Sequence, residues 1–227
     1  MVRLLLEATA IFSGVTLGFL ADDFRDYRND RKQEHESLTQ VLLDLELDSE
    51  DMSPMLPQTE AIAEGTQWIS NHAAKGQVPS DSLLMVLDSL SQTPAYSYEA
   101  SDFAYSGLVN TGRIDLIRDA NLRRALVVYF KDRQPIVAAV NAQWRKAYFE
   151  WWESAGNHID FLPDERPDEA WPHVRAADAP ALGRDRKFLL RTIAINNWSR
   201  TLRKDIEEAF DLSADLAERI RAYLDES

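Results

Sequence analysis

Histidine is the side chain most often used as a catalytic base or metal ligand near neutral pH, and this chain has four. They are dispersed along the sequence, at His35, His72, His158 and His173. No two have the spacing of a metal-binding motif such as HExxH, in which both imidazoles share one helix face. In Glu34-His35-Glu36 the neighbours point to different faces of a helix. We therefore expect structural or solvent-exposed histidines and no metal site.

The sequence also lacks the residues that other common reactions require. The chain has no cysteine, which removes disulfides, thiolate catalysis and cysteine-ligated metals. It has no Walker loop, no GxGxxG, no nucleophile elbow and no ExxH pair of the di-iron type. The net charge of -13 argues against nucleic-acid binding, because phosphates demand a basic surface. We predict no cofactor and no catalytic residue, with an unrecognised carboxylate-site enzyme as the least favoured alternative.

Five aromatic residues gather between positions 144 and 152: Trp144, Tyr148, Phe149, Trp151 and Trp152. They could line a cofactor or lie against a membrane interface. Positions 144, 148, 151 and 152 fall on one side of a helix, which is typical of core packing. We favour the core, and no histidine accompanies the group to ligate a haem.

The segment that must position the rest of the chain is residues 4–21, LLLEATAIFSGVTLGFLA. Its eighteen residues, with one charge at Glu7, are at the short end of the ~20 that span a bilayer. Apolar residues surround the whole helix instead of forming one stripe. A cleaved signal peptide is disfavoured because Phe19 stands where a small residue is expected. We predict a transmembrane anchor over residues 1–21, with a buried core helix as the other alternative.

One face of this helix differs from the rest. At 100° per residue Glu7, Ile11, Gly14 and Gly18 lie close together, and Ala10 extends the row of small residues. Residues 14–18 are a literal GxxxG, a motif that lets two membrane helices approach closely. A carboxylate in the bilayer also favours a protein-facing position. The sequence predicts helix packing through Glu7, Ala10, Ile11, Gly14 and Gly18, with other membrane subunits or with a second copy as partner.

Basic residues follow the apolar segment and set the expected orientation. They are Arg25, Arg28, Arg31 and Lys32, and only Arg3 precedes the segment. Under the positive-inside rule this places the body in the cytoplasm, on the cell (inner) membrane, with a single pass. The four basic residues are expected at the lipid headgroups, where four interleaved aspartates weaken the case for a specific lipid site.

The remainder of the chain shows helical periodicity and no convincing alternating strand. Residues 22–53 form a juxtamembrane helix with an apolar stripe at Leu38, Val41, Leu42 and Leu45, ended by Pro54. Residues 54–227 form a body with helices expected at 58–74, 96–106, 119–152 and 185–224. Pro135 should kink or interrupt the third, and the Pro-rich stretch 157–183 should be irregular. The predicted fold is all-α, an antiparallel helical bundle.

Charge is distributed unevenly along the chain. Between Gln33 and Gly112 there are thirteen acidic residues and one basic residue, Lys75, whereas residues 113–153 have eight basic and five acidic residues. These surfaces can neutralise one another within the bundle or remain solvated. The alternative is an acidic half that docks a basic partner.

Two blocks of the sequence together resemble a group of bacterial single-span membrane proteins of unknown function. The first is residues 4–50, with a membrane glutamate and a glycine-containing span. The second is residues 96–131, with the pattern L-I-x-(D/N)-x-x-L-R; its matching residues are Tyr98, Gly112, Leu116, Ile117, Asp119, Leu122, Arg123, Tyr129 and Phe130. Asp22-Asp23-Phe24 replaces the family's tryptophan-containing exit. The resemblance implies a membrane-anchored helical body and supplies no catalytic residues.

These observations favour a non-enzymatic, membrane-anchored scaffold, an accessory subunit of a larger integral-membrane complex such as a bioenergetic or transport assembly. The alternative is a sensor or regulator that passes a signal between body and span.

Overall fold

The computed structural model describes residues 2–76, 78–161 and 173–225, without the side chains of residues 2–11, 13 and 15. Helices dominate, as the sequence predicts: α1 (Val2–Met52), α2 (Met55–Ala74), α3 (Ser80–Ser91), α4 (Phe103–Asn110), α5 (Ala120–Val127), α6 (Gln134–Ala155), α7 (Ala179–Leu182) and α8 (Arg186–Asp225). The all-α class is therefore confirmed.

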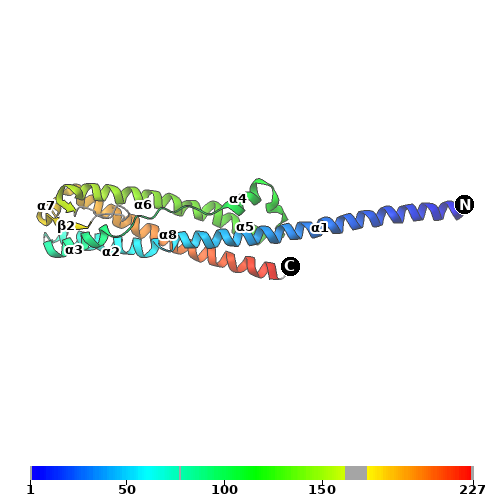
Figure 1. Cartoon of the computed structure of the whole chain (residues 1–227), viewed down its shortest axis with the longest axis horizontal. Coiled ribbons are helices and arrows are strands. Elements are labelled where there is room, and N and C mark those ends of the chain that lie inside the picture. The colour runs from blue at the N-terminus through cyan, green and yellow to red at the C-terminus, as the bar shows by residue number, and fades with distance from the viewer. Residues whose placement is uncertain (1, 77, 162–172, 226–227) are drawn as a thin grey trace.

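Three long helical paths make up an elongated body (Figure 1). The first is α1 followed by α2 in the same direction, and the second is α5 followed by α6. The third is α8, which runs back antiparallel to both and contacts α1, α2, α5 and α6. The single helix expected at 185–224 is thus confirmed as α8, and it is the element that joins the other two paths.

The apolar core forms two clusters along this body. The larger lies among α2, α3, α6 and α8, far from the N-terminal end of α1, and includes Ile62, Leu87 and Trp151. The smaller lies where α1 meets α4, α5 and the end of α8, and includes Leu38 and Leu126. The second half of α1 is therefore part of the body's core as well as the continuation of the N-terminal segment.

The helix expected at 119–152 is interrupted as Pro135 requires. Asp119 caps α5 by accepting hydrogen bonds from the N–H groups of Asn121 and Leu122, at 2.7 and 3.3 Å. A π-helical segment, η2 (Val128–Arg133), then precedes α6, whose second residue is Pro135. Proline has no N–H to donate and its ring collides with an α-helical carbonyl one turn back, so a locally wider turn accommodates it.

Several predicted boundaries are wrong. The second helix begins at Met55 and not at 58, because Pro57 sits in its first turn, where proline is tolerated. Residues 96–102 belong to no helix or strand and α4 starts at Phe103, so the helix expected at 96–106 is present only from residue 103. The physical reason is tertiary: the N–H of Tyr98 donates to the Asn141 side chain and that of Ser101 to Asp48, both at 3.1 Å.

The stretch predicted as irregular, 157–183, contains regular structure at its described ends. Strands β1 (Ile159–Phe161) and β2 (Val174–Ala177) pair antiparallel, with Ile159 opposite Ala177, and η3 (Gly156–His158) precedes them. The prediction of no strand is therefore wrong here. Strands of three and four residues are too short to show an alternating pattern in the sequence.

Within the part of the chain that the structure describes, no helix is both long and apolar enough to cross a membrane. Most side chains in the first half of the apolar segment 4–21 lie outside that part. The predicted transmembrane span thus has no support from the described residues and stays a prediction.

Candidate functional site at the root of the projecting helix

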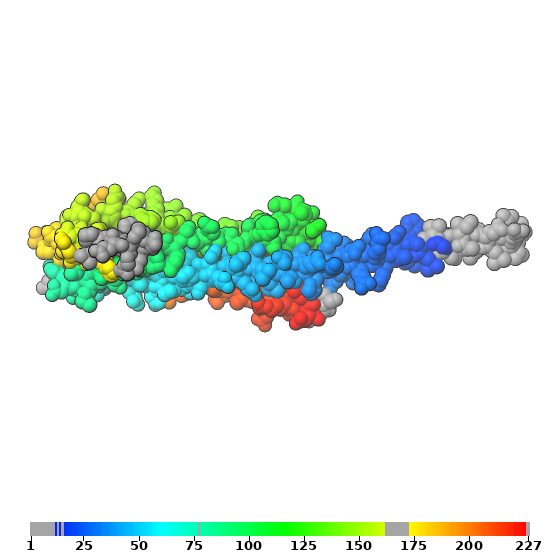
Figure 2. All heavy atoms as spheres, in the orientation of Figure 1, coloured from blue at the N-terminus to red at the C-terminus, as the bar shows by residue number. Residues whose placement is uncertain are grey.

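Helix α1 leaves the body near residue 31 and continues alone toward its N-terminus (Figures 1 and 2). Every described side chain from Phe12 to Asp30 is exposed, whereas Glu34 and Leu38 are buried. We call the place where α1 emerges between α8 and the segment that follows α4 the root of the helix. A movement of the projecting part reaches the body through this root.

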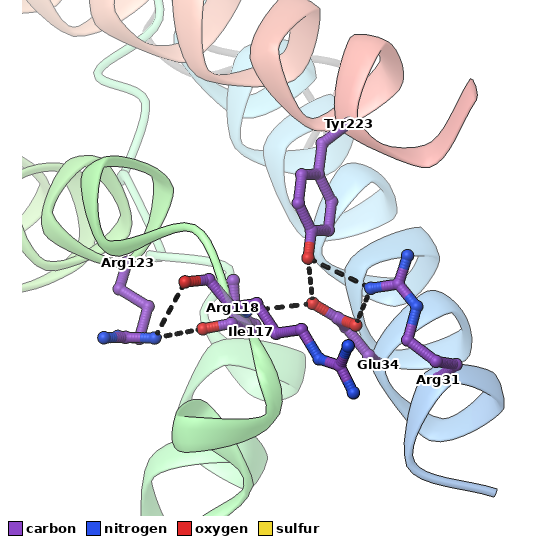
Figure 3. Close-up of polar contacts among 6 residues, drawn as sticks. All are labelled: Arg31, Glu34, Ile117, Arg118, Arg123 and Tyr223. Carbon is purple, nitrogen blue, oxygen red and sulfur yellow. Dashed lines mark hydrogen bonds and ion pairs between the residues drawn. The ribbon is translucent and has the colours of Figure 1, made fainter. Parts of the chain in front are cut away.

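Glu34 is the hub of this root (Figure 3). Its Oε1 accepts a hydrogen bond from the backbone N–H of Arg118 at 3.1 Å and another from the Tyr223 hydroxyl at 2.5 Å. Its Oε2 pairs with the Arg31 guanidinium, which also donates to the Tyr223 hydroxyl at 3.1 Å. One carboxylate thereby ties α1 to the segment before α5 and to the end of α8. We call Arg31, Glu34, Arg118 and Tyr223 the root cluster.

The turn that presents Arg118 to Glu34 is built by the second sequence block. Gly112 adopts a left-handed conformation with φ 71°, which lets the chain turn out of α4 into η1 (Arg113–Leu116). Ile117 is fully buried and Asp119 caps α5. The Arg123 guanidinium donates to the Ile117 carbonyl, closing the loop (Figure 3). The L-I-x-D-x-x-L-R pattern thus builds the turn that holds the Arg118 N–H against Glu34.

The protonation states at the root follow from its burial. Desolvation and the hydrogen bond to Glu34 raise the pKa of the Tyr223 phenol, so the hydroxyl keeps its proton and donates. The Arg118 guanidinium lies over the Tyr27 ring, with its central carbon 4.3 Å from the ring centroid. This cation–π contact extends the root one turn along the projecting helix.

Two further buried carboxylates continue the same attachment along α1. The Oδ2 atom of Asp44 accepts hydrogen bonds from the N–H groups of Ala104 and Tyr105, at 2.7 and 3.3 Å. These N–H groups belong to the first turn of α4, whose exposed donors favour a negative charge. Helix α4 is therefore capped by a residue of α1, some 60 positions earlier in the chain.

Asp48, which is fully buried, lies between the two core clusters. Its Oδ1 accepts from the Tyr98 hydroxyl at 2.6 Å and the Ser101 N–H at 3.1 Å. Its Oδ2 accepts from the Tyr129 hydroxyl at 2.5 Å and the Gln134 amide at 3.0 Å. Burial, reinforced by the Asp48 charge, raises the pKa of both tyrosines, so both remain donors. Four donors thus satisfy one buried carboxylate without a cation.

Sequence reasoning missed these three carboxylates as structural groups. It treated the acidic residues of this region as solvated, as neutralised by basic residues, or as a surface for a basic partner. A signal was present for two of them: Glu34, Leu38, Val41, Leu45, Asp48 and Met52 follow one another at spacings of three and four, and all are buried. Acids on the apolar stripe of a helix require partners inside the fold.

Of the five residues predicted to pack one membrane helix against another, the structure describes the surroundings of two, Gly14 and Gly18. The side chains of Glu7, Ala10 and Ile11 lie outside the described residues. At Gly14 and Gly18 no atom lies within 4 Å of the position a Cβ would take, so no described element of this chain covers them.

The four basic residues predicted at the headgroups divide into two kinds. Arg25 and Arg28 are exposed, and Lys32 makes an exposed ion pair with Glu36 at 3.7 Å. Arg31 instead turns toward Glu34 and belongs to the root cluster.

The aromatic group at 144–152 packs in the core, as predicted for its four coaligned members. Trp144, Tyr148, Trp151 and Trp152 are buried, and Phe149 is partly exposed. The indole N–H of Trp144 donates to Ser199 at 2.8 Å and that of Trp151 to Thr192 at 2.9 Å. These bonds fix α6 against α8.

The histidines lie apart from one another. His72 stacks on Trp68, while His158 and His173 contact Asp185 and Asp88 at 3.1 and 3.0 Å. Among the described residues no group of three His, Asp or Glu side chains could hold a metal ion. The chain matches no protein-family model, no curated protein and no solved structure. The resemblance to bacterial single-span proteins therefore stays a prediction.

Proposed function

We propose that the chain is a single-pass membrane protein whose helical body acts as a scaffold or accessory subunit for other integral-membrane proteins. The observation that carries this proposal is the projecting part of α1. Its large apolar side chains are exposed with nothing from the body against them: Phe12, Leu17, Phe19, Leu20 and Phe24 are 58–73% exposed. An apolar helix of this kind is unfavourable in water and favourable in hydrocarbon.

The length of the projecting helix supports an anchor that holds the body clear of the lipid. Ala21 ends the apolar segment and Arg31 begins the body, and the ten helical steps between them cover about 15 Å. The headgroup layer is only about 5–8 Å thick on each side of the hydrocarbon. Arg25 and Arg28 then lie at the membrane surface, which favours a cytoplasmic body.

Extraction of membranes from cells expressing the full chain tests the anchor. We expect the chain to stay in the membrane pellet in alkaline carbonate, and the double variant Leu17→Asp with Leu20→Asp to be released. Leu190→Asp with Ile193→Asp is the matched control, since these body residues are similarly exposed, at 58% and 51%, and should have no effect. Release of the unmodified chain by carbonate would contradict the proposal.

The scaffold role has its own test. Purification in a mild detergent should recover the full chain with partner proteins, or as an assembly of its own, in fixed stoichiometry. A lone monomer from membranes that retain the chain would contradict the interaction role and leave the anchor intact.

A sensor or regulator is the second candidate, and the observation in its favour is the continuity of α1. One uninterrupted helix runs from Val2 through the root cluster to Asp48 and Met52. Motion of the span would therefore reach the contacts between α1 and the segment 96–118. Hydrogen exchange distinguishes the two: a relay predicts that Asn29→Pro, which breaks the helix outside the body, alters protection at 112–118, whereas a passive anchor predicts no change.

A further inference from the structure

Helix α1 has two opposite faces, one covered by the body and one exposed. From Glu34 onward the body covers the face that bears Leu38 and Val41. The other face, which we call the outer face, is exposed at every position from the apolar segment into the body: Gly14, Gly18, Asp22, Arg25, Asn29, Lys32, Glu36, Gln40, Leu43 and Leu47. Their spacings of three and four residues keep them on one side of the helix. Figure 2 shows α1 as an uncovered ridge between the green and red segments of the body.

Two leucines make this face unusual for a solvated surface. Leu43 and Leu47 lie one turn apart and are 47% and 52% exposed, whereas the other exposed side chains of α1 between Glu34 and Met52 are polar or charged. No described element of the chain packs over them. An adjacent pair of exposed leucines at helical spacing is the pattern by which one helix packs on another.

We propose that the outer face of α1 binds the outer face of a second copy of this chain in a parallel two-fold dimer. The inference rests on the proposed membrane anchor, because two chains inserted in the same bilayer with the same orientation must pair in parallel. The outer-face side chains are exposed along the whole stretch from Gly14 to Leu47, so a second helix can reach them.

In this arrangement, opposite charges one turn away offset the like charges that meet across the two-fold axis. A parallel two-fold places each position beside its own counterpart and beside positions one turn away. Arg25 then lies beside Asp22 of the second copy, and Lys32 lies beside Glu36 of the second copy. Uncharged Asn29 falls between the two pairs, where a polar residue in a helix pair fixes register.

The charged residues that flank the outer face also meet opposite charges of the second copy. Arg28 borders the face on one side and Asp26 on the other, and both are exposed. A two-fold axis brings opposite flanks together, so Arg28 approaches Asp26 of the second copy.

The contact runs from the leucine pair to the apolar segment. The 33 steps from Gly14 to Leu47 cover about 50 Å of helix. At its N-terminal end, no described atom outside the glycines' own stretch of helix backbone lies within 4 Å of a Cβ placed at Gly14 or Gly18, which leaves room for close approach by the second helix. The leucines and the charge pattern carry the inference, and the glycines are compatible with it.

Disulfide trapping tests the dimer directly, because the chain has no cysteine of its own. Full-length Leu43→Cys and Leu47→Cys, each oxidised in native membranes, should form a covalent homodimer in most of the chain. The matched control is Leu190→Cys, at an exposed position of α8 (58%), which should remain monomeric. Equal trapping at all three positions, or none at positions 43 and 47, would overturn the proposal.

A second measurement does not depend on oxidation. The mass of the chain in detergent should be that of a dimer, and Leu43→Glu with Leu47→Glu should halve it while the helical circular dichroism stays unchanged. Met85→Glu, at a residue 74% exposed on α3, should leave the dimer intact. A chain that resists carbonate and is recovered with other proteins but not with a second copy, or that is trapped only to a different protein, overturns the dimer alone. A lone monomer that resists carbonate overturns the dimer and the interaction role together, and release by carbonate overturns the anchor.

Discussion

The two halves of α1 share a helix and a high charge content, but the body treats them in opposite ways. In the outer half Phe24 is 68% exposed beside exposed Asp22 and Asp23. In the inner half Leu38 is fully buried, and so are Glu34, Asp44 and Asp48. Whether a residue of α1 is buried or exposed therefore depends on what lies beside the helix and not on the residue's own hydropathy. The buried acids hold the body to α1, whereas no described residue of the body covers the exposed apolar side chains.

Asp48→Ala should have the largest effect on the inner half. It removes the acceptor shared by Tyr98, Tyr129 and Gln134, and leaves buried donors without partners, at a cost of about 3 kcal/mol in the free energy of unfolding. Urea denaturation of the full chain in detergent measures this. Asp51→Ala, at an exposed position of the same helix, is the control and should change stability by less than about 0.5 kcal/mol. Equal effects of the two variants would refute a structural role for Asp48.

Glu34→Ala should come next, at about 2 kcal/mol, because the N–H of Arg118 and the hydroxyl of Tyr223 lose their shared acceptor. The damage should be local. Hydrogen exchange is expected to accelerate at residues 112–118 and at the end of α8, and to stay unchanged in α2 and α6. Glu36→Ala, two residues away and exposed, serves as control. Uniform acceleration of hydrogen exchange along the whole body would show that the root cluster does not stabilise its own region independently of the rest.

Asp44→Asn should show a smaller effect that depends on pH. Burial raises the pKa of the Asp44 carboxyl above its ordinary value of 3.8, despite the two backbone N–H groups that lower it. The folded chain therefore holds this proton to a higher pH than the unfolded chain does. The free energy of unfolding falls as pH rises from the pKa of Asp44 in the unfolded chain to its higher pKa in the folded chain. The stability of the asparagine variant relative to the parent should be greater at pH 7 than at pH 3.5. A pH-independent difference would contradict this assignment.

Phe24→Ser should have the smallest effect on the body. Although it removes a large apolar side chain, the free energy of unfolding should change by less than about 0.5 kcal/mol. Leu38→Ala, on the buried half of the same helix, should cost about 3 kcal/mol. A large loss of stability from Phe24→Ser would mean that the outer half is covered by the body after all.

The sequence revealed what local patterns determine. The 3.6-residue period located α8 within a residue or two, Asp119 marked a helix start, and Pro135 marked an interruption. It did not reveal what distant partners determine. The non-helical run 96–102, the cap that Asp44 supplies to α4 and the donors that satisfy Asp48 depend on groups 43 to 86 positions apart, which no local window contains. The carboxylates were visible in the sequence, but their donors were not.

The π-helical segment Val128–Arg133 has a consequence for how this chain tolerates changes in length. A π turn holds one residue more than an α-helical turn, and here it lets the neighbours Tyr129 and Phe130 both be buried. Because the extra residue is taken up within η2, the helix after it keeps nearly the phase it would have if that residue were absent and the segment α-helical. A one-residue deletion inside η2 should therefore leave Trp144 and Trp151 facing α8, whereas a one-residue deletion in α6 before Trp144 would rotate both by about 100°. The segment thus tolerates a change in chain length that the ordinary helix beside it does not.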